Sequence, residues 1–460
     1  MALLYAVTAP RHVSPSGTPI GLAGNPTGHM QTVVLAAGQG TRMRPLTDRR
    51  PKPMLPVADR PLVAHTVDAA IDAGADRIVL VVGYEADEIR AYFGESRAGV
   101  PVEYVVQERQ AGTADAVRAA ADALERAPFA VLNGDALFDQ AGLDDLYADG
   151  PAVGSVRVDD PSQYGVLDVT DGRVTGITEK PEEPPSELVN AGAYVFPADA
   201  LDWLDVPESE RGEHELTDVL ERTIDAVEVR PVAFDRWLDV GRPWELLSAN
   251  EWKVAELVDD RRSLTDGRGA AESSSAVRSS PGAAESATVG TENAEAPVDG
   301  VVSEDATLEG GVVVEDGATI RPGVVIEGPV VVREGATVGP NAYVRGPTLI
   351  GPEASVGHAV EIKNSVLMAG AAVNHLSYVG DSILGRDVNL GAGTVVANLR
   401  HDDEPVRLTV KGERVSTGRR KFGVVLGDEA KTGIDTNINA GVTLSTGATT
   451  TPGESVLRDR

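Results

Sequence analysis

The sequence predicts an α/β protein with two folded units: an open, mainly parallel β-sheet covered by helices, and then a parallel β-helix. Two patterns predict this order. Short β-rich runs alternate with longer helical runs up to about residue 258, and an aliphatic residue then recurs at every sixth position. A chain of 460 residues also suffices for two cores of roughly 200 residues each. We expect a disordered leader at 1–29, the first unit at 30–258, a flexible linker at 259–300 and the second unit at 301–460.

In the first unit, longer helical runs such as PLVAHTVDAAIDAG and TADAVRAAADALERA separate the β-rich runs TVVLAAG, RIVLVVG, VEYVVQ and FAVLNGD. Parallel strands need crossovers of this length, which helices usually supply. The alternation ends at the helical run RPWELLSANEWKVAELVDD. Residues 262–298 are instead rich in Ser, Ala, Gly and Glu, with too few large apolar side chains to fold. Residues 1–29 lack the charge order of a signal peptide, so Met30 is an alternative start.

The second unit repeats every six residues, which is neither a helical nor a simple strand period. The pattern indicates a parallel β-helix in which each rung points one aliphatic side chain inward. The repeat runs from Val302 to Met368, reaches Asn374 beside His375, and resumes at Leu384. We expect that an inward rung is given up there to present His375. Departures around His375 and at 399–422 should be loops on one face, where binding sites tend to lie.

Composition excludes several classes of function. The net charge of −30 makes a nucleic acid or an anionic membrane an improbable partner. No apolar run approaches the ~18 residues of a membrane span. The chain has no Cys, which excludes disulfides and thiolate metal sites and fits a reducing cytoplasm. An acidic, Lys-poor composition resembles that of proteins from salt-loving cells, where salt screens self-repulsion.

The loop VVLAAGQGTRMRPLTDRRPKPMLPV suggests phosphate binding. Gly38 and Gly40 follow a strand and let backbone N–H groups approach a phosphate, while Arg42, Arg44 and Lys52 can neutralise a triphosphate. A tight turn with surface arginines would explain the loop equally well if it stood alone.

The full string resembles the signature of the sugar-1-phosphate nucleotidyltransferases, and the resemblance spans about residues 31–258. It implies a Rossmann-like unit with a mixed, mainly parallel sheet that binds UTP or dTTP and a sugar 1-phosphate. Arg42 and Lys52 would assist catalysis, with Arg42 on the departing pyrophosphate and Lys52 near the sugar phosphate. The resemblance places the triphosphate at Gly38, Gly40, Thr41 and Arg42, the base at Gln107, Gly112 and Thr113, and the sugar at Tyr164, Gly165, Glu179, Lys180 and Asn190.

Asp135 in VLNGDALF and Asp239 in WLDVGRP each follow a β-rich run, so both can lie at the carboxyl ends of strands. Two such carboxylates can hold Mg²⁺ between phosphate oxygens. Taken singly, each is better read as the cap of a helix or turn. Within the resemblance we favour metal ligation.

The string VEIKNSVLMAGAAVNHLSYVGDSILGRDVNLGAGTVVAN resembles the acetyltransferase half of the bifunctional enzyme that makes UDP-N-acetylglucosamine. It implies a left-handed β-helix, acetyl-CoA as cosubstrate, and a homotrimer with shared sites. A lone His is usually not catalytic, but His suits deprotonation of an amine at neutral pH, and its matched neighbours favour a base. The implied roles are base for His375, sugar-phosphate and sugar contacts for Arg345, Lys363, Tyr378 and Asn389, and acetyl-CoA contacts for Ala392, Asn398 and Lys421.

We therefore expect acetylation of glucosamine 1-phosphate, followed by uridylyl transfer to N-acetylglucosamine 1-phosphate with release of pyrophosphate. Residues 399–420 form a longer insertion than in the bacterial pattern, and Ile434 stands where the bacterial enzymes carry Ser. One alternative is a glucose-1-phosphate thymidylyltransferase with a non-catalytic β-helix, because RGEHELTDVLERTI also resembles that branch. Another is a non-catalytic subunit that senses nucleotide sugars, against which the intact charged residues of the first unit argue.

Overall fold

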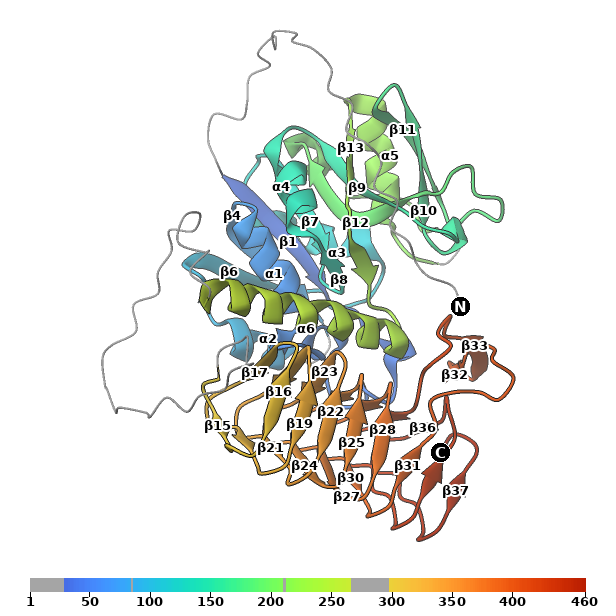
Figure 1. The fold of residues 1–460 in the computed structure, drawn as a ribbon. Coiled ribbons are helices and arrows are strands. Elements are labelled where there is room, and N and C mark those ends of the chain that lie inside the picture. The colour runs from blue at the N-terminus through green and yellow to red at the C-terminus, as the bar shows by residue number, and fades with distance from the viewer. Residues whose placement is uncertain (1–28, 84–85, 210–211, 266–297) are drawn as a thin grey trace, which may run out of the picture.

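The computed structural model describes residues 29–83, 86–209, 212–265 and 298–460 (Figure 1). The predicted leader and most of the predicted linker lie outside the described residues. No helix in the described ranges is long and apolar enough to cross a membrane.

The first unit is a mixed sheet with strand order β11-β10-β12-β7-β1-β4-β6-β5, and β9 and β13 extend it beside β12. The central strands β7, β1, β4 and β6 are parallel, as predicted, whereas β12 runs antiparallel to β7. The strands of this sheet are β1 Met30–Ala36, β4 Ala75–Val82, β5 Ser96–Arg97, β6 Val100–Val106, β7 Phe129–Asn133, β9 Ala152–Arg157, β10 Gly165–Thr170, β11 Arg173–Glu179, β12 Leu188–Phe196 and β13 Arg230–Ala233. Two small two-stranded sheets lie beside it: β2 Pro56–Val57 with β3 Arg60–Pro61, and β8 Ala136–Phe138 with β14 Trp237–Asp239.

Helices cover both faces of this sheet, which explains the nearly continuous apolar runs of its central strands. Val34 of β1 packs in one cluster with α1 and α4, and Val33 packs in another with α3 and α5. Both side chains are fully buried. The helices are α1 Leu62–Asp72, α2 Ala86–Phe93, α3 Thr113–Ala120, α4 Gln140–Ala148, α5 Leu216–Ala226 and α6 Pro243–Thr265.

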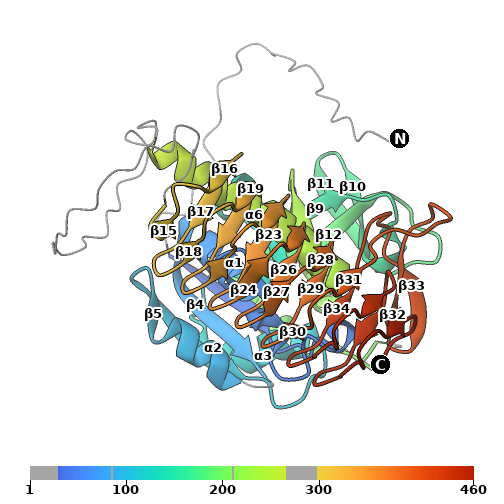
Figure 2. The same cartoon turned by 60° about the horizontal axis from the view of Figure 1, so that its bottom comes forward.

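The second unit is a left-handed parallel β-helix with three faces, named here A, B and C in chain order (Figure 2). Face A comprises β15 Val301–Val302, β18 Thr319–Ile320, β21 Thr337–Val338, β24 Ser355–His358, β27 Ala372–His375 and β30 Asn389–Leu390. Face B comprises β16 Thr307–Glu309, β19 Val325–Glu327, β22 Tyr343–Arg345, β25 Glu361–Lys363, β28 Tyr378–Gly380, β31 Val395–Val396, β35 Asn437–Ile438 and β37 Ser455–Val456. Face C comprises β17 Val312–Val314, β20 Val330–Val332, β23 Thr348–Ile350, β26 Val366–Leu367, β29 Ile383–Leu384, β34 Val425–Leu426 and β36 Thr443–Leu444.

The aliphatic side chains of the six-residue repeat do point inward, as predicted. The prediction that an inward side chain is missing beside His375 is wrong. Val373 pairs with Val356, is fully buried and fills the inward position of face A, so no rung is given up beside His375. Leu367, rather than the expected Met368, fills the inward position of face C. The chain is one residue shorter at the corner between Ile362 and Leu367, and this shift alone moves the apparent rhythm onto Asn374.

Helix α6 joins the two units, because it lies along face C of the β-helix (Figures 1 and 2). Leu247, Val254 and Val258 of α6 belong to one buried cluster with Val331 and Ile383 of face C. We expected two separately folded units on a flexible linker, but the units share this apolar core. The helix also continues past residue 258 to Thr265, into the range predicted as linker.

The insertion at 399–420 folds over the same core. It forms an antiparallel hairpin of β32 Arg407–Val410 and β33 Glu413–Ser416. Val406 and Leu408 lie in the shared cluster with Phe422, and all three are almost completely buried. The insertion is therefore anchored between the two units.

Asn250 is the fully buried polar side chain at the centre of α6. Its amide oxygen accepts a hydrogen bond from Ala58 N at 2.9 Å, and its Nδ2 donates to Pro56 O at 3.2 Å and Leu246 O at 3.1 Å. We expect Asn250→Ala to lower the free energy of unfolding by about 1–3 kcal/mol, since it leaves buried backbone groups without partners. Urea unfolding measures this effect. Asn437→Ala, at an exposed position, is the control, and an equal effect of both variants would contradict the prediction.

Candidate functional sites

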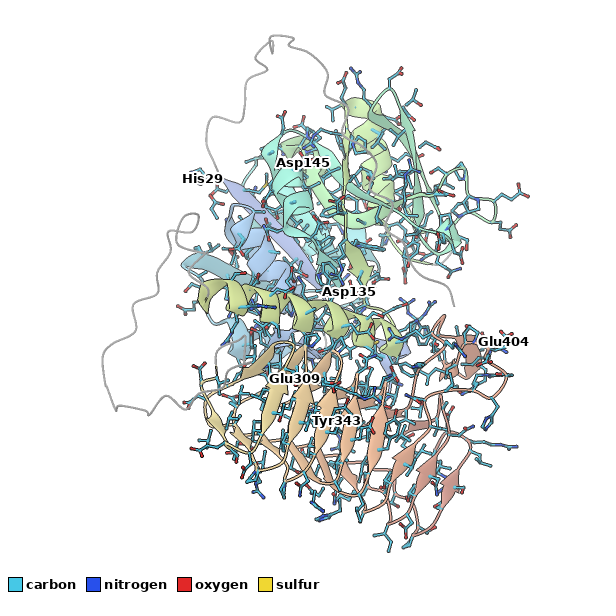
Figure 3. All side chains as sticks on the ribbon, viewed as in Figure 1. His29, Asp135, Asp145, Glu309, Tyr343 and Glu404 are labelled. Carbon is cyan, nitrogen blue, oxygen red and sulfur yellow. The ribbon has the colours of Figure 1, made fainter. Side chains whose placement is uncertain are left out.

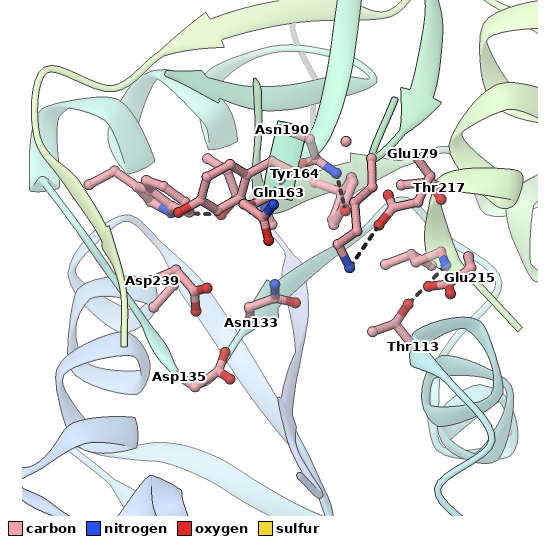
Figure 4. Close-up of a pocket in the computed structure, with 18 of the residues that line it drawn as sticks. Thr113, Asn133, Asp135, Gln163, Tyr164, Glu179, Asn190, Glu215, Thr217 and Asp239 are labelled. Atoms are coloured by element: carbon pink, nitrogen blue, oxygen red, sulfur yellow. Dashed lines mark hydrogen bonds and ion pairs between the residues drawn. The ribbon is translucent and has the colours of Figure 1, made fainter. Parts of the chain in front are cut away.

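A cavity of about 640 Å³ opens in the first unit, at the ends of the central strands (Figure 4). Asp135 and Asp239 lie on one side of it, and Glu179, Glu215 and Thr217 lie on the other. The predicted site residues that line it are Arg42, Thr113, Asp135, Tyr164, Gly165, Glu179, Lys180, Asn190 and Asp239.

The loop predicted to bind phosphate packs closely against Lys52 at Gly40. Gly40 has a positive φ of 61°, and a Cβ there would lie 2.6 Å from Lys52 Cβ, so only Gly fits. Thr47 Oγ1 donates to Gly40 O at 2.9 Å and fixes the turn. Gly38 faces open space, as a phosphate-binding position requires. Thr41 begins the short 3₁₀ helix Thr41–Met43, which carries Arg42 to the cavity.

Asp135 and Asp239 come together because β14 pairs with β8, which places Asp239 opposite Ala136. Lys52 is buried, and its ammonium lies 2.6 Å from Asp135 Oδ2. Burial, and then the charge of Asp135, raise the pKa of Asp239. Among the described residues no cluster of three or more His, Asp or Glu side chains could hold a metal ion. The pair does fit a divalent cation that takes its other oxygen ligands from phosphates.

Sequence reasoning missed two charged residues beside Asp239. Arg242 and Glu245 line the cavity, and Glu245 Oε2 accepts from Gly241 N at 2.8 Å. Burial, and then the charge of Asp239, raise the pKa of Glu245 to about 7. A Cβ on Gly241 would lie 3.6 Å from Arg42 Nη2, so Arg42 reaches the same turn. The signal was the string DVGRPWE, in which both residues closely follow the predicted ligand.

The side of the cavity that holds the predicted sugar contacts is polar with an aromatic wall. Lys180 pairs with Glu179 at 3.4 Å, and Asn190 Nδ2 donates to Tyr194 Oη at 2.6 Å. The ring of Tyr164 packs edge-on against Trp237 at 5.5 Å between centroids. Burial, and then the charge of Asp239, raise the pKa of Tyr164 to about 12. Other lining residues that sequence reasoning missed are Asn133, Gln163, Glu215, Thr217 and Trp237.

The predicted base-binding residues form a rigid turn. Gln107 is buried, and its Nε2 donates to Gly112 O at 3.1 Å and to Asp115 Oδ2 at 2.9 Å. Gly112 has a φ of 113°, and a Cβ there would lie 2.3 Å from His214 O. Thr113 Oγ1 accepts from Leu216 N at 2.9 Å. Gln107 and Gly112 are therefore together, and their contact with a base stays a prediction.

A second set of predicted residues stacks at the corner between faces A and B. Gly393 N donates to His375 O at 3.1 Å, and on the next coil Asp435 N donates to Ala392 O at 2.7 Å. His375, Ala392 and Ile434 consequently occupy one column on successive coils. His375 is exposed and pairs in register with His358 on the coil below, a relation that the sequence reasoning did not anticipate.

Face B gathers the predicted acceptor residues. Arg345, Lys363 and Gly380 are register partners on successive coils. A Cβ on Gly380 would lie 2.5 Å from Tyr378 Oη, so the missing side chain leaves room for Tyr378 to reach Asn398, whose Nδ2 donates to it at 3.1 Å. Figure 3 labels Tyr343 on this face and Asp135 in the first unit.

Two predicted residues lie elsewhere. Asn389 pairs with Ala372 on face A and is exposed, and Lys421 is an exposed residue bridged to Leu399 at the start of the insertion. In a single chain, His375 and Asn389 thus lie across a corner from Lys363.

Comparisons with known proteins agree with two enzymatic units. The model of the nucleotidyl transferase family matches residues 31–255, and that of the GMPPB C-terminal domain matches residues 326–446. A Methanococcus vannielii protein named bifunctional protein GlmU is 37% identical, with 90% of this chain and 91% of that protein covered. A Sulfurisphaera tokodaii protein named bifunctional sugar-1-phosphate nucleotidylyltransferase/acetyltransferase is 33% identical, with 94% and 98% covered. A Haloferax volcanii UTP–glucose-1-phosphate uridylyltransferase is 40% identical over 46% of this chain and 92% of its own length.

Proposed function

This chain belongs to the family of bifunctional sugar-1-phosphate nucleotidyltransferases/acetyltransferases, and on that premise we propose that it makes UDP-N-acetylglucosamine in two steps. It first transfers an acetyl group from acetyl-CoA to the amine of glucosamine 1-phosphate. It then transfers uridylyl from UTP to N-acetylglucosamine 1-phosphate and releases pyrophosphate. The observation that carries the proposal is that one chain holds the Lys52–Asp135–Asp239 cluster in its first unit, and both the column of His375 and the face-B row of Lys363 in its second.

In the uridylyl step, a phosphate oxygen of the sugar attacks the α-phosphorus of UTP, and the bond to the β-phosphate oxygen breaks. The attacking phosphate is already ionised, so no general base is needed. Negative charge builds on the pyrophosphate, where Arg42 can stabilise it. Asp135 and Asp239 would hold Mg²⁺, which neutralises phosphate charge when bound. Lys52, beside Asp135, keeps this side of the cavity from becoming uniformly anionic.

In the acetyl step, His375 takes the proton of the amine as the amine attacks the thioester carbonyl, and the thiolate of CoA leaves. Arg345 and Lys363 bind the sugar phosphate, and Tyr378 and Asn389 contact the sugar. Ala392, Asn398 and Lys421 lie along acetyl-CoA. Because His375 and Asn389 belong to the side of face A, one neighbouring copy would have to bring its face B against them. We therefore propose a homotrimer with shared acetyl sites.

The acidic, Lys-poor surface suits work at high salt, and both cosubstrates are cytoplasmic metabolites, so we place the reaction in the cytoplasm of a halophile.

The proposal is tested with the purified chain, UTP or dTTP, and glucose, glucosamine or N-acetylglucosamine 1-phosphate, with and without acetyl-CoA. Product from UTP and N-acetylglucosamine 1-phosphate, together with acetylation of glucosamine 1-phosphate, is the expected result. Preference for dTTP and glucose 1-phosphate without acetyl transfer would favour the glucose-1-phosphate thymidylyltransferase alternative. Nucleotide-sugar binding without turnover would favour a sensing subunit.

A further inference from the structure

Asp381 is a buried carboxylate that joins the two sides of the acetyl site. Its side chain is 3% exposed. Its Oδ2 accepts from Lys363 Nζ at 2.8 Å and from Asn398 Nδ2, and its Oδ1 accepts from Asn364 Nδ2 at 2.9 Å. One carboxylate therefore contacts both the residue assigned to the sugar phosphate and a residue assigned to acetyl-CoA.

The network continues into the first unit. Asn364 Nδ2 also donates to Glu251 Oε1 of α6 at 2.7 Å, so a single amide group bridges two carboxylates. Arg419, from the end of the insertion, donates to Glu251 Oε2 at 3.0 Å and to Ser248 Oγ at 2.8 Å. Each carboxylate is thus balanced by one cation, as buried charges require.

Asn364 and Asp381 carry side chains at a corner position that Gly occupies on two other coils. Gly310 and Gly346 follow the last face-B residue on their coils with positive φ, the conformation that Gly adopts readily. Asn364 and Asp381 hold the same position with φ of 44° and 51°. A side chain there brings backbone strain, which persists only where the surroundings fix it. The corner between Val379 and Leu384, which holds Asp381, is one residue shorter than the others, as is the corner between Ile362 and Leu367, which holds Asn364. The break in the repeat therefore marks this network and not His375.

We propose that Asp381 is a positioning residue of the acetyl site, supported across the unit boundary by Asn364 and Glu251. Asp381 accepts one hydrogen bond from the Lys363 ammonium, which leaves the other two N–H donors of that ammonium for the phosphate of the acceptor. It also fixes Asn398 relative to Lys363, which sets the spacing between the two substrates. The inference rests on the proposed acetyl transfer.

Pre-organisation of this kind should appear in the affinity for the acceptor. We expect Asp381→Asn to lower kcat/KM for glucosamine 1-phosphate by roughly 10- to 100-fold. Asn364→Gly should raise the KM for glucosamine 1-phosphate on the order of 3- to 10-fold. The KM for UTP should stay unchanged in both. Asn364→Gly should also keep the thermal midpoint, because Gly already occupies this turn position on other coils.

Glu429→Gln is the matched control, since it breaks an ion pair with Arg49 that also joins the two units but lies away from Asp381. It should leave every acetyl-transfer constant unchanged. If Asp381→Asn fails to fold, Asn364→Gly decides. If the wild type acetylates glucosamine 1-phosphate and both variants keep the wild-type KM for it, the positioning role of Asp381 is overturned and the proposed function stands. An equal loss in all kinetic constants with a lower folded fraction also overturns the positioning role. No acetyl transfer by the wild type overturns the proposed function together with this inference.

Discussion

Asp239→Asn is expected to lower pyrophosphate release by at least ~10²-fold while the folded chain keeps or gains stability. The activity falls because the amide is a poorer ligand for a divalent cation. The stability effect follows from the raised pKa of Asp239. A carboxyl group with a raised folded pKa stabilises the fold fully below its unfolded pKa of about 4, and this contribution is lost as pH rises through the folded pKa. Towards neutral pH the burial of Asp239 beside Asp135 therefore weakens the ligand-free fold, and Asn removes that effect.

Thermal midpoints and pyrophosphate release, measured together from pH 4 to pH 8, check this result. The midpoint advantage of the variant should shrink as pH falls towards 4. Asp135→Asn is the informative comparison, because it should lose the same activity with a lower midpoint. Asp135 forms the direct ion pair with the buried Lys52 ammonium, and the substitution removes that pair. Full pyrophosphate release by folded Asp239→Asn would refute the assigned role.

Acetyl transfer should persist in both variants, since neither carboxylate contacts the residues assigned to the acetyl site in the β-helix. The units share an apolar core, so an unfolded variant would lose both activities. The midpoints distinguish that outcome from a direct effect on chemistry.

His375→Ala is expected to lower acetylation of glucosamine 1-phosphate by ~10²- to 10⁴-fold, because the amine loses its general base. Uridylyl transfer and the thermal midpoint should not change, since the side chain is exposed. His358→Ala is the matched control, because His358 lies in the same column one coil below. Acetylation that survives in His375→Ala would show that His375 is only a surface residue.

Mixing subunits tests whether the site is shared. His375→Ala and Asn398→Ala chains, inactive alone, should recover part of the acetylation when they form mixed trimers. Mixed trimers confirmed by mass without recovered acetylation would count against a shared site.

Much of the architecture could be predicted because its signals are local. The crossover pattern identified the parallel sheet, and the six-residue repeat identified the β-helix. Asp135 and Asp239 could be named because each comes at or just after the end of a β-rich run: Asp135 follows β7 of the main sheet, and Asp239 ends β14, which pairs with β8 in a separate two-stranded sheet. Glu215 and Thr217 could not be placed in the cavity from the sequence, since α5 reaches the site only through packing on the sheet.

The sequence by itself determined the two fold types, because residue spacing fixes which side chains share a face, and it named the candidate site residues. Only the tertiary structure decided how the break in the repeat is absorbed. When a corner is one residue shorter, every later aliphatic position in the sequence shifts by one residue. The sequence pattern therefore cannot distinguish a missing inward side chain from a shortened corner. The pairing of Val373 with Val356 in the structure makes that distinction. The tertiary structure also decided that the units are coupled. The linear pattern cannot show that α6 buries its apolar side chains on face C, because that contact depends on docking two surfaces far apart in the chain. The same docking brings Glu251 to Asn364, and with it the support of Asp381.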